Sequence, residues 1–117
     1  MLLAAAAIAL NVLAIDPGEA DAIAARLDGQ RFTIAADRTS IALDDVAGRG
    51  PPEVGVIELR GDALWIVPAG GAPARLTGPL ARPRIAGPGY TVWVIGEAAP
   101  DGSIHARRLG ILRRPRA

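Results

Sequence analysis

The sequence predicts a mainly β protein, built as a small barrel of five to seven short strands with one short N-terminal α-helix. Several short runs alternate apolar with polar residues, and glycine or proline turn signals separate these runs at near-regular spacing. Only one stretch shows helical periodicity. The chain has 117 residues, half of them apolar, which indicates a single domain and excludes disorder over the whole chain.

The composition excludes several classes of chemistry. The chain contains no cysteine, which rules out disulfides, thiolate metal sites and a thiol nucleophile. It contains one histidine, so a histidine-rich metal cluster is excluded. Nothing in the sequence indicates a cofactor.

Residues 1–14 form an uncharged apolar segment, MLLAAAAIALNVLA. The segment is shorter than the ~20 residues that a helix needs to span a bilayer, and it matches the apolar region of a secretory signal. We expect cleavage after Ala14 and a periplasmic or secreted domain over 15–117. The basic residues that normally open a signal are missing, so three alternatives stay open. The true start of the chain lies upstream, or the segment is an apolar helix packed in a cytoplasmic protein, or it is an uncleaved segment at a membrane.

A short amphipathic helix is expected over Pro17–Asp28. Asp16 is suited to cap it, Pro17 suits the first helical position, and Glu19 follows at the spacing of a capping box. The apolar positions that share one face are Ala20, Ile23, Ala24 and Leu27. The acidic positions are expected on a solvated face: Glu19, Asp21 and Asp28.

Two short strands are expected over 31–34 and 39–43, joined by a turn at 36–38, before a loop over 44–52. Gly61-Asp62 then separates strands over 53–60 and 63–67, as a hairpin turn does.

The second half continues this pattern. A short strand over 74–77 precedes an irregular connection over 78–89, which is rich in glycine and proline. The strongest strand signal is 90–97, and Pro100-Asp101-Gly102 turns it into a strand over 103–109 that continues apolar to Leu112. Residues 113–117 are expected to be a frayed basic tail.

Trp65 and Trp93 each stand in the centre of an aliphatic strand, so both are expected in the core. Closing the strands into a barrel would remove exposed sheet edges. Together with one helix, this pattern fits a five-stranded, partly open barrel of the OB type.

The stretch from Arg75 to Leu112 carries a family resemblance. Its sequence GYTVWVIGEAAPDGSIHARRLGIL joins a valine-rich strand that ends in Gly-Glu to an Asp-Gly hairpin and a strand with alternating small residues. This pattern resembles small bacterial OB-type barrels such as the periplasmic haem chaperones of cytochrome c maturation. The resemblance implies a fold and a compartment. That family attaches haem through a histidine and a tyrosine after the last strand, whereas Arg113 and Arg114 follow Leu112 here, so haem binding is not implied.

Catalysis is not indicated by any assembled set of residues. Ser103 and His105 lie two residues apart on one strand face, but the sequence places no carboxylate to orient the histidine ring. We therefore interpret His105 as a solvent-facing strand residue and predict that the protein is not an enzyme. A hydrolase using this pair is the third alternative.

The charge is distributed unevenly along the chain. Residues 1–60 hold nine acids and five arginines, whereas residues 61–117 hold three acids and eight arginines. A basic surface on the second half would suit a small anionic ligand or a protein partner. The residues proposed for it come from the 78–89 connection, the start of the strand over 90–97 and the last strand: Arg82, Arg84, Tyr90, Arg107 and Arg108.

The leading hypothesis is thus a non-catalytic binding or interaction module of the cell envelope. The alternative is a nucleic-acid-binding OB domain. The near-neutral net charge of +1 and the small number of aromatic residues disfavour that alternative.

Overall fold

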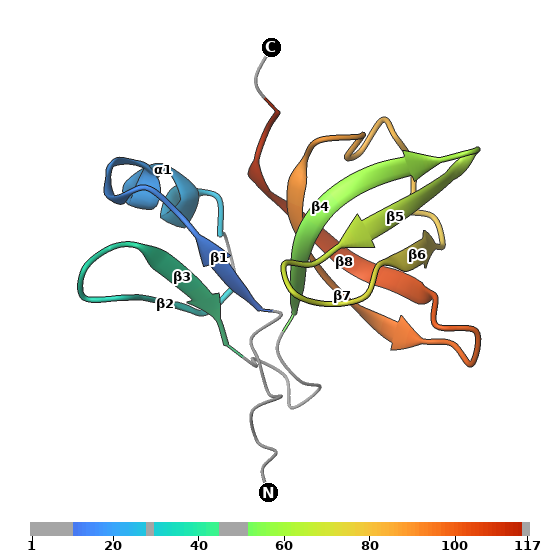
Figure 1. The fold of residues 1–117 in the computed structure, drawn as a ribbon, viewed down its shortest axis with the longest axis horizontal. Helices are drawn as coiled ribbons and strands as arrows, with labels where there is room; N and C mark the ends of the chain where they lie inside the picture. The colour runs from blue at the N-terminus through green and yellow to red at the C-terminus, as the bar shows by residue number, and fades with distance from the viewer. Residues whose placement is uncertain (1–10, 28–29, 45–51, 116–117) are drawn as a thin grey trace, which may run out of the picture.

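The computed structural model describes residues 11–27, 30–44 and 52–115. Within these ranges the protein is mainly β with one short α-helix, as predicted. Figure 1 shows a small N-terminal layer beside a larger barrel. The elements are β1 (Val12–Ala14), α1 (Ala20–Ala25), β2 (Phe32–Ile34), β3 (Ser40–Leu43), β4 (Glu53–Arg60), β5 (Ala63–Val67), β6 (Ala74–Thr77), β7 (Thr91–Ala98) and β8 (Ile104–Arg113).

The last five strands form a closed barrel in the order β4-β5-β6-β8-β7, with β7 pairing back to β4. All neighbouring strands are antiparallel except β6 and β8, which run parallel. Alternate residues of each strand fill the interior because successive side chains point to opposite faces of a sheet. The buried interior residues are Ile57, Leu64, Ile66, Leu76, Ala86, Val92, Val94, Ile104 and Ala106.

The predicted hairpin of β4 and β5 is confirmed, with the predicted bounds. Gly61 takes a positive φ of 64° in the turn between them, a conformation that glycine adopts without steric cost. The predicted strand over 74–77 is β6, and the connection from 78 to 90 has no helix or strand, as expected.

The long pair β7 and β8 contains two β-bulges. The register steps from Ile95↔Arg108 to Gly96↔Ala106, which leaves Arg107 as the extra residue on β8. A second step near Thr91 leaves Leu112 as the other extra residue. Strand β8 thus extends to Arg113, and the prediction of a frayed tail from Arg113 onward is wrong for that residue.

The N-terminal layer is a three-stranded antiparallel sheet in the order β1-β3-β2 with α1 beside it. The strands predicted over 31–34 and 39–43 are β2 and β3, but they pair with each other and with β1 and are not barrel strands. Strand β1 itself comes from the segment interpreted as a signal. Of that segment, residues 1–10 lie outside the described residues, as does most of the loop expected over 44–52.

The helix is shorter than predicted. A single 3₁₀ turn over Pro17–Glu19 leads into α1, which ends at Ala25. The carboxylate of Glu19 accepts a hydrogen bond of 2.8 Å from the backbone N–H of Asp16, as in the predicted capping box. Of the predicted apolar face, Ala20, Ile23 and Leu27 are buried and Ala24 is half-buried.

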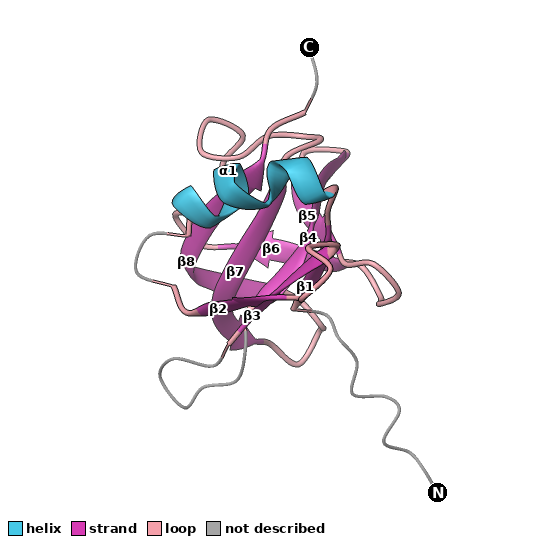
Figure 2. Ribbon diagram, turned by 90° about the vertical axis from the view of Figure 1, so that its left-hand side faces the viewer, coloured by secondary structure: helices cyan, strands magenta, loops and turns pink. Residues whose placement is uncertain are grey.

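The two parts share a second hydrophobic core, which we call the junction core. The outer face of the barrel supplies Val54, Trp93 and Leu112, and the N-terminal layer covers them with Ile15, Ala20, Ile23, Leu27, Ile41 and Leu43. Figure 2 shows α1 and the small sheet in front of β7 and β8. Trp93 is 4% exposed, so its prediction as a core residue is confirmed. The layer therefore covers the outer face of β7 and β8, and β5 and β6 lie on another side of the barrel.

Candidate functional site

A row of polar and aromatic side chains crosses the outer face of three barrel strands. Leu64 and Ile66 point into the barrel, so Trp65 between them points outward. Its direct cross-strand neighbours are Glu58 on β4 and Arg75 on β6. The prediction of Trp65 as a core residue is thus wrong: the indole is half-buried on the outer surface. The alternation of residues in β5 already contained this signal.

Trp65 lines a cleft of about 330 Å³ beside this row. A second wall is formed by Pro73, directly before β6, and by Arg75 within it. The third wall is the turn between β7 and β8. That turn contributes Asp101, Gly102 and Ser103. Two of the lining residues form an ion pair: the guanidinium of Arg75 lies 3.5 Å from the Asp101 carboxylate. Both side chains are about half exposed. We call this feature the Trp65 cleft.

The turn that carries Asp101 is held by its own hydrogen bonds. The backbone N–H and the hydroxyl of Ser103 both donate to one carboxylate oxygen, Oδ1, at 2.9 and 2.6 Å. Gly102 has a positive φ of 87°, and its N–H donates to the Ala99 carbonyl. The other carboxylate oxygen, Oδ2, is the one that meets Arg75. Hydrogen bonds from Ser103 lower the pKa of Asp101, and the Arg75 charge adds to this effect.

Replacing Ser103 with alanine is expected to raise the pKa of Asp101, because the hydroxyl donor that stabilises the carboxylate is lost. In the wild type the lowered pKa contributes stability above the unfolded-state pKa, and this contribution is lost as the pH falls through the folded-state pKa. The change is measured by an NMR titration of the Asp101 carboxyl carbon.

A matched control lies elsewhere in the chain. Asp37 accepts the same two hydrogen bonds from Thr39, and its pKa is lowered for the same reason. The Asp37 titration should not change in the Ser103 variant. An unchanged Asp101 titration would contradict the role given to the Ser103 hydroxyl.

Arg60 also lies beside Trp65. Its guanidinium carbon lies 5.0 Å from the centroid of the Trp65 ring, within cation–π range, and it forms an ion pair with Glu58. The two arginines beside Trp65 are each paired with a carboxylate: Arg60 with Glu58, and Arg75 with Asp101. The charges around the indole are therefore balanced pair by pair.

The residues of the predicted basic surface lie on the connection from β6 to β7 and on β8. Arg82 and Arg84 are exposed on the connection from β6 to β7, and the Arg82 Nε donates to the Pro79 carbonyl at 3.1 Å. Leu80, Ala81 and Ala86 of this connection pack against the barrel interior, as does the half-buried Tyr90.

Arg107 and Arg108 have separate environments. Arg107 donates twice to Glu97, at 3.0 and 2.8 Å. Arg108 lies over the ring of Trp93, with its guanidinium carbon 5.6 Å from the centroid. Arg108 pairs with Ile95 on β7, five residues from Tyr90, which corresponds to roughly 16 Å along the strand. Arg108 and Tyr90 are therefore separated along β7, and the predicted surface that includes both stays a prediction.

Ser103 and His105 do not form a catalytic pair in the structure. Ser103 is 5% exposed and its hydroxyl donates to Asp101. The His105 ring packs against Gly78, where an added Cβ would lie 3.0 Å from the ring. His105 is half-buried, so it is less open to solvent than predicted. Among the described residues, no three histidine or acidic side chains come together as metal ligands.

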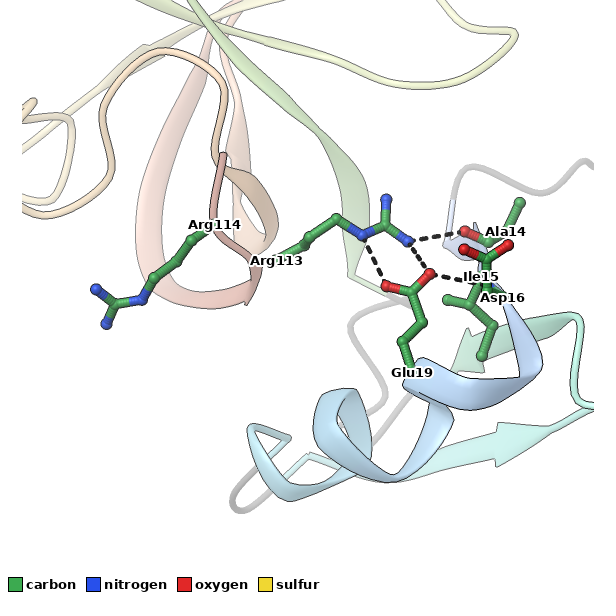
Figure 3. A pocket seen from close by; sticks show the side chains of 6 residues that line it. All are labelled: Ala14, Ile15, Asp16, Glu19, Arg113 and Arg114. Carbon is green, nitrogen blue, oxygen red and sulfur yellow. Dashed lines mark hydrogen bonds and ion pairs between the residues drawn. The ribbon is translucent and has the colours of Figure 1, made fainter. Parts of the chain in front are cut away.

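A larger cleft, of about 540 Å³, lies between the N-terminal layer and the end of β8. Figure 3 shows Arg113 reaching Glu19 while Arg114 points away from it. The Nε and Nη2 atoms of Arg113 donate to the two carboxylate oxygens of Glu19, each at 3.1 Å, and Nη2 also reaches the Ala14 carbonyl. The prediction of Glu19 as a solvated residue is therefore wrong. Arg113 joins Glu19 and Ala14 of the N-terminal layer to the end of β8, so we assign this cleft a structural role.

Fold and site together define a small mainly β protein whose closed five-stranded barrel carries an outward-facing tryptophan in a polar cleft. Comparisons with protein-family models, curated proteins and solved structures find no match to this chain. The described part of the chain contains no helix of the length and apolar character needed to cross a membrane.

Proposed function

We propose that this protein is a non-catalytic binding module with an OB-type barrel and that the Trp65 cleft is its ligand site. The order of the barrel strands supports the fold. Numbered from β4, the ring runs first, second, third, fifth, fourth, and the third and fifth strands are parallel. An OB barrel binds ligands on the face of its second and third strands, between the first hairpin turn and the loop before the fifth strand.

The position of Trp65 is the observation that carries the proposal. The second and third strands here are β5 and β6, and Trp65 and Arg75 are neighbours across that pair. The turn with Asp101 stands before β8, where the second binding loop of the fold belongs. A half-exposed indole beside paired charges can hold a ligand by stacking and hydrogen bonding, and no chemical step is needed.

The experiment titrates the wild type and each variant with a neutral oligosaccharide mixture and with a short single-stranded oligonucleotide by isothermal titration calorimetry, and tryptophan fluorescence is recorded in parallel. We expect one class to change the emission of Trp65, and Trp65→Ala to weaken its binding about tenfold or more. Arg84→Ala and Arg108→Ala, at positions of the basic surface predicted from sequence, should bind normally. Absence of binding by both classes would overturn the proposal, and so would binding that survives Trp65→Ala.

We further propose the cell envelope as the compartment, on the strength of the apolar start of the sequence. Strand β1 pairs with β3 through Val12–Ala14, so cleavage after Ala14 would remove a strand of the small sheet. The pairing of β1 therefore supports the alternative of an uncleaved segment at a membrane. Cell fractionation with intact-mass measurement tests both statements, and a purely cytoplasmic product would contradict export.

A further inference from the structure

We propose that the Trp65 cleft recognises a neutral sugar unit, which stacks on Trp65 and forms hydrogen bonds with Arg75 and Asp101. This inference rests on the function proposed above and names its ligand class. Three observations support it: the aromatic ring of Trp65 in the cleft, the pairing of the nearby arginines with carboxylates, and the size of the cleft.

The indole ring of Trp65 matches the shape of a sugar ring. A pyranose has one face of C–H groups and an edge of hydroxyls, so it needs an aromatic surface and hydrogen-bonding groups at right angles to it. Trp65 is the aromatic side chain that lines the cleft, and the guanidinium of Arg60, which is not among the cleft-lining residues, lies over its ring at 5.0 Å from the centroid. The hydroxyl edge would meet Arg75, a donor, and Asp101, an acceptor.

The charge balance separates a neutral ligand from a nucleic acid. A groove for single strands requires cations that follow the phosphates, with several stacking rings along it. The arginines near Trp65 are paired with Glu58 and Asp101. The Ser103 hydrogen bonds favour the ionised form of Asp101, which would repel a phosphate. Paired charges suit a ligand that is rich in hydroxyls and carries no charge of its own.

The volume of the cleft also suits a small ligand. At about 330 Å³ it lies at the lower end of the range of ligand pockets, which starts near 300 Å³. The cleft is built on an outer sheet face, so a longer glycan would extend beyond it over β4 and β5. We therefore expect one or two sugar units of a chain to be held.

The test is a glycan array that displays neutral, sulfated and phosphorylated glycans, read with the full-length protein. The wild type is expected to retain neutral glycans, with little loss of signal as salt is raised. Trp65→Ala should lower the apparent affinity about tenfold or more, and Trp65→Phe should retain part of it. Unfolding midpoints close to that of the wild type would show that these variants fold.

Asp101→Asn provides the discriminating variant. It removes a charged acceptor and one partner of Arg75, so binding of a neutral glycan should weaken, whereas binding of an anionic ligand should strengthen. Retention of only anionic glycans, or salt-dependent binding of an oligonucleotide through Trp65, would overturn the sugar assignment and leave the binding module standing. If neither neutral glycans nor oligonucleotides bind, both proposals fall.

Discussion

Replacing Trp93 with alanine is expected to lower the free energy of unfolding by about 3–5 kcal/mol, the range for buried aromatic side chains. Trp93 is 4% exposed and lies in the junction core, where Val54 and Leu112 flank it on the barrel side and Ile23 and Ile41 belong to the facing layer. Truncation removes apolar contact on both sides and leaves a cavity that neither part of the molecule can close.

Urea denaturation followed by circular dichroism measures this loss. Trp65→Ala is the matched control, because it removes the same indole from the outer surface and should cost about 1 kcal/mol or less. Trp93→Phe should be milder than Trp93→Ala: the indole N–H is buried with no hydrogen-bond partner among the described residues, so phenylalanine loses no hydrogen bond. Equal losses for the two alanine variants would contradict the assignment of Trp93 to a core between the parts.

Replacing Gly110 with alanine is expected to destabilise the protein by about 1–3 kcal/mol, the usual range for overpacking. Gly110 is the direct cross-strand partner of Trp93. A Cβ at this position would lie 2.3 Å from the indole Nε1 and 2.4 Å from Cε2, far inside van der Waals contact. The buried indole cannot move aside because the junction core surrounds it.

A double-mutant cycle with Trp93→Phe tests this explanation. The smaller ring lacks the atoms that an added Cβ would meet, so the cost of Gly110→Ala should fall in that background. Gly18→Ala is the control, since no atom lies within 4 Å of its Cβ position and its free energy change should be near zero. Additive losses in the cycle would show that the steric conflict lies elsewhere.

The barrel strands were predictable because their signals are local. Strands β4, β5 and β6 have the predicted bounds, since alternation and the turn at Gly61-Asp62 are encoded within a few residues. Strand β1 was missed because Val12–Ala14 has only three residues, all apolar, at the end of an almost wholly apolar stretch, so no period can be read there. Its pairing with Ser40–Ala42 is a long-range contact.

The candidate site was less accessible to sequence reasoning. The alternation in β5 places Trp65 opposite Leu64 and Ile66, so its outward position could have been read from the sequence. The approach of Asp101 to Arg75 could not, because it depends on closure of the ring through the parallel pair β6 and β8. The arginine surface stays a prediction, because its residues are clustered along the chain and their individual contacts, such as Arg107 with Glu97 and Arg108 with Trp93, depend on the pairing of β7 with β8.

The long strand β8 has a consequence for synthesis in the cell. It supplies Ile104 and Ala106 to the barrel interior, Leu112 to the junction core and Arg113 to the contacts with Glu19 and Ala14. Neither core is complete until residues 104–113 have left the ribosome, so we expect the two cores to form together and folding to be all-or-none. Ribosome-bound chains that end before Ile104 should be degraded readily by protease, and protection of such chains would disprove this expectation.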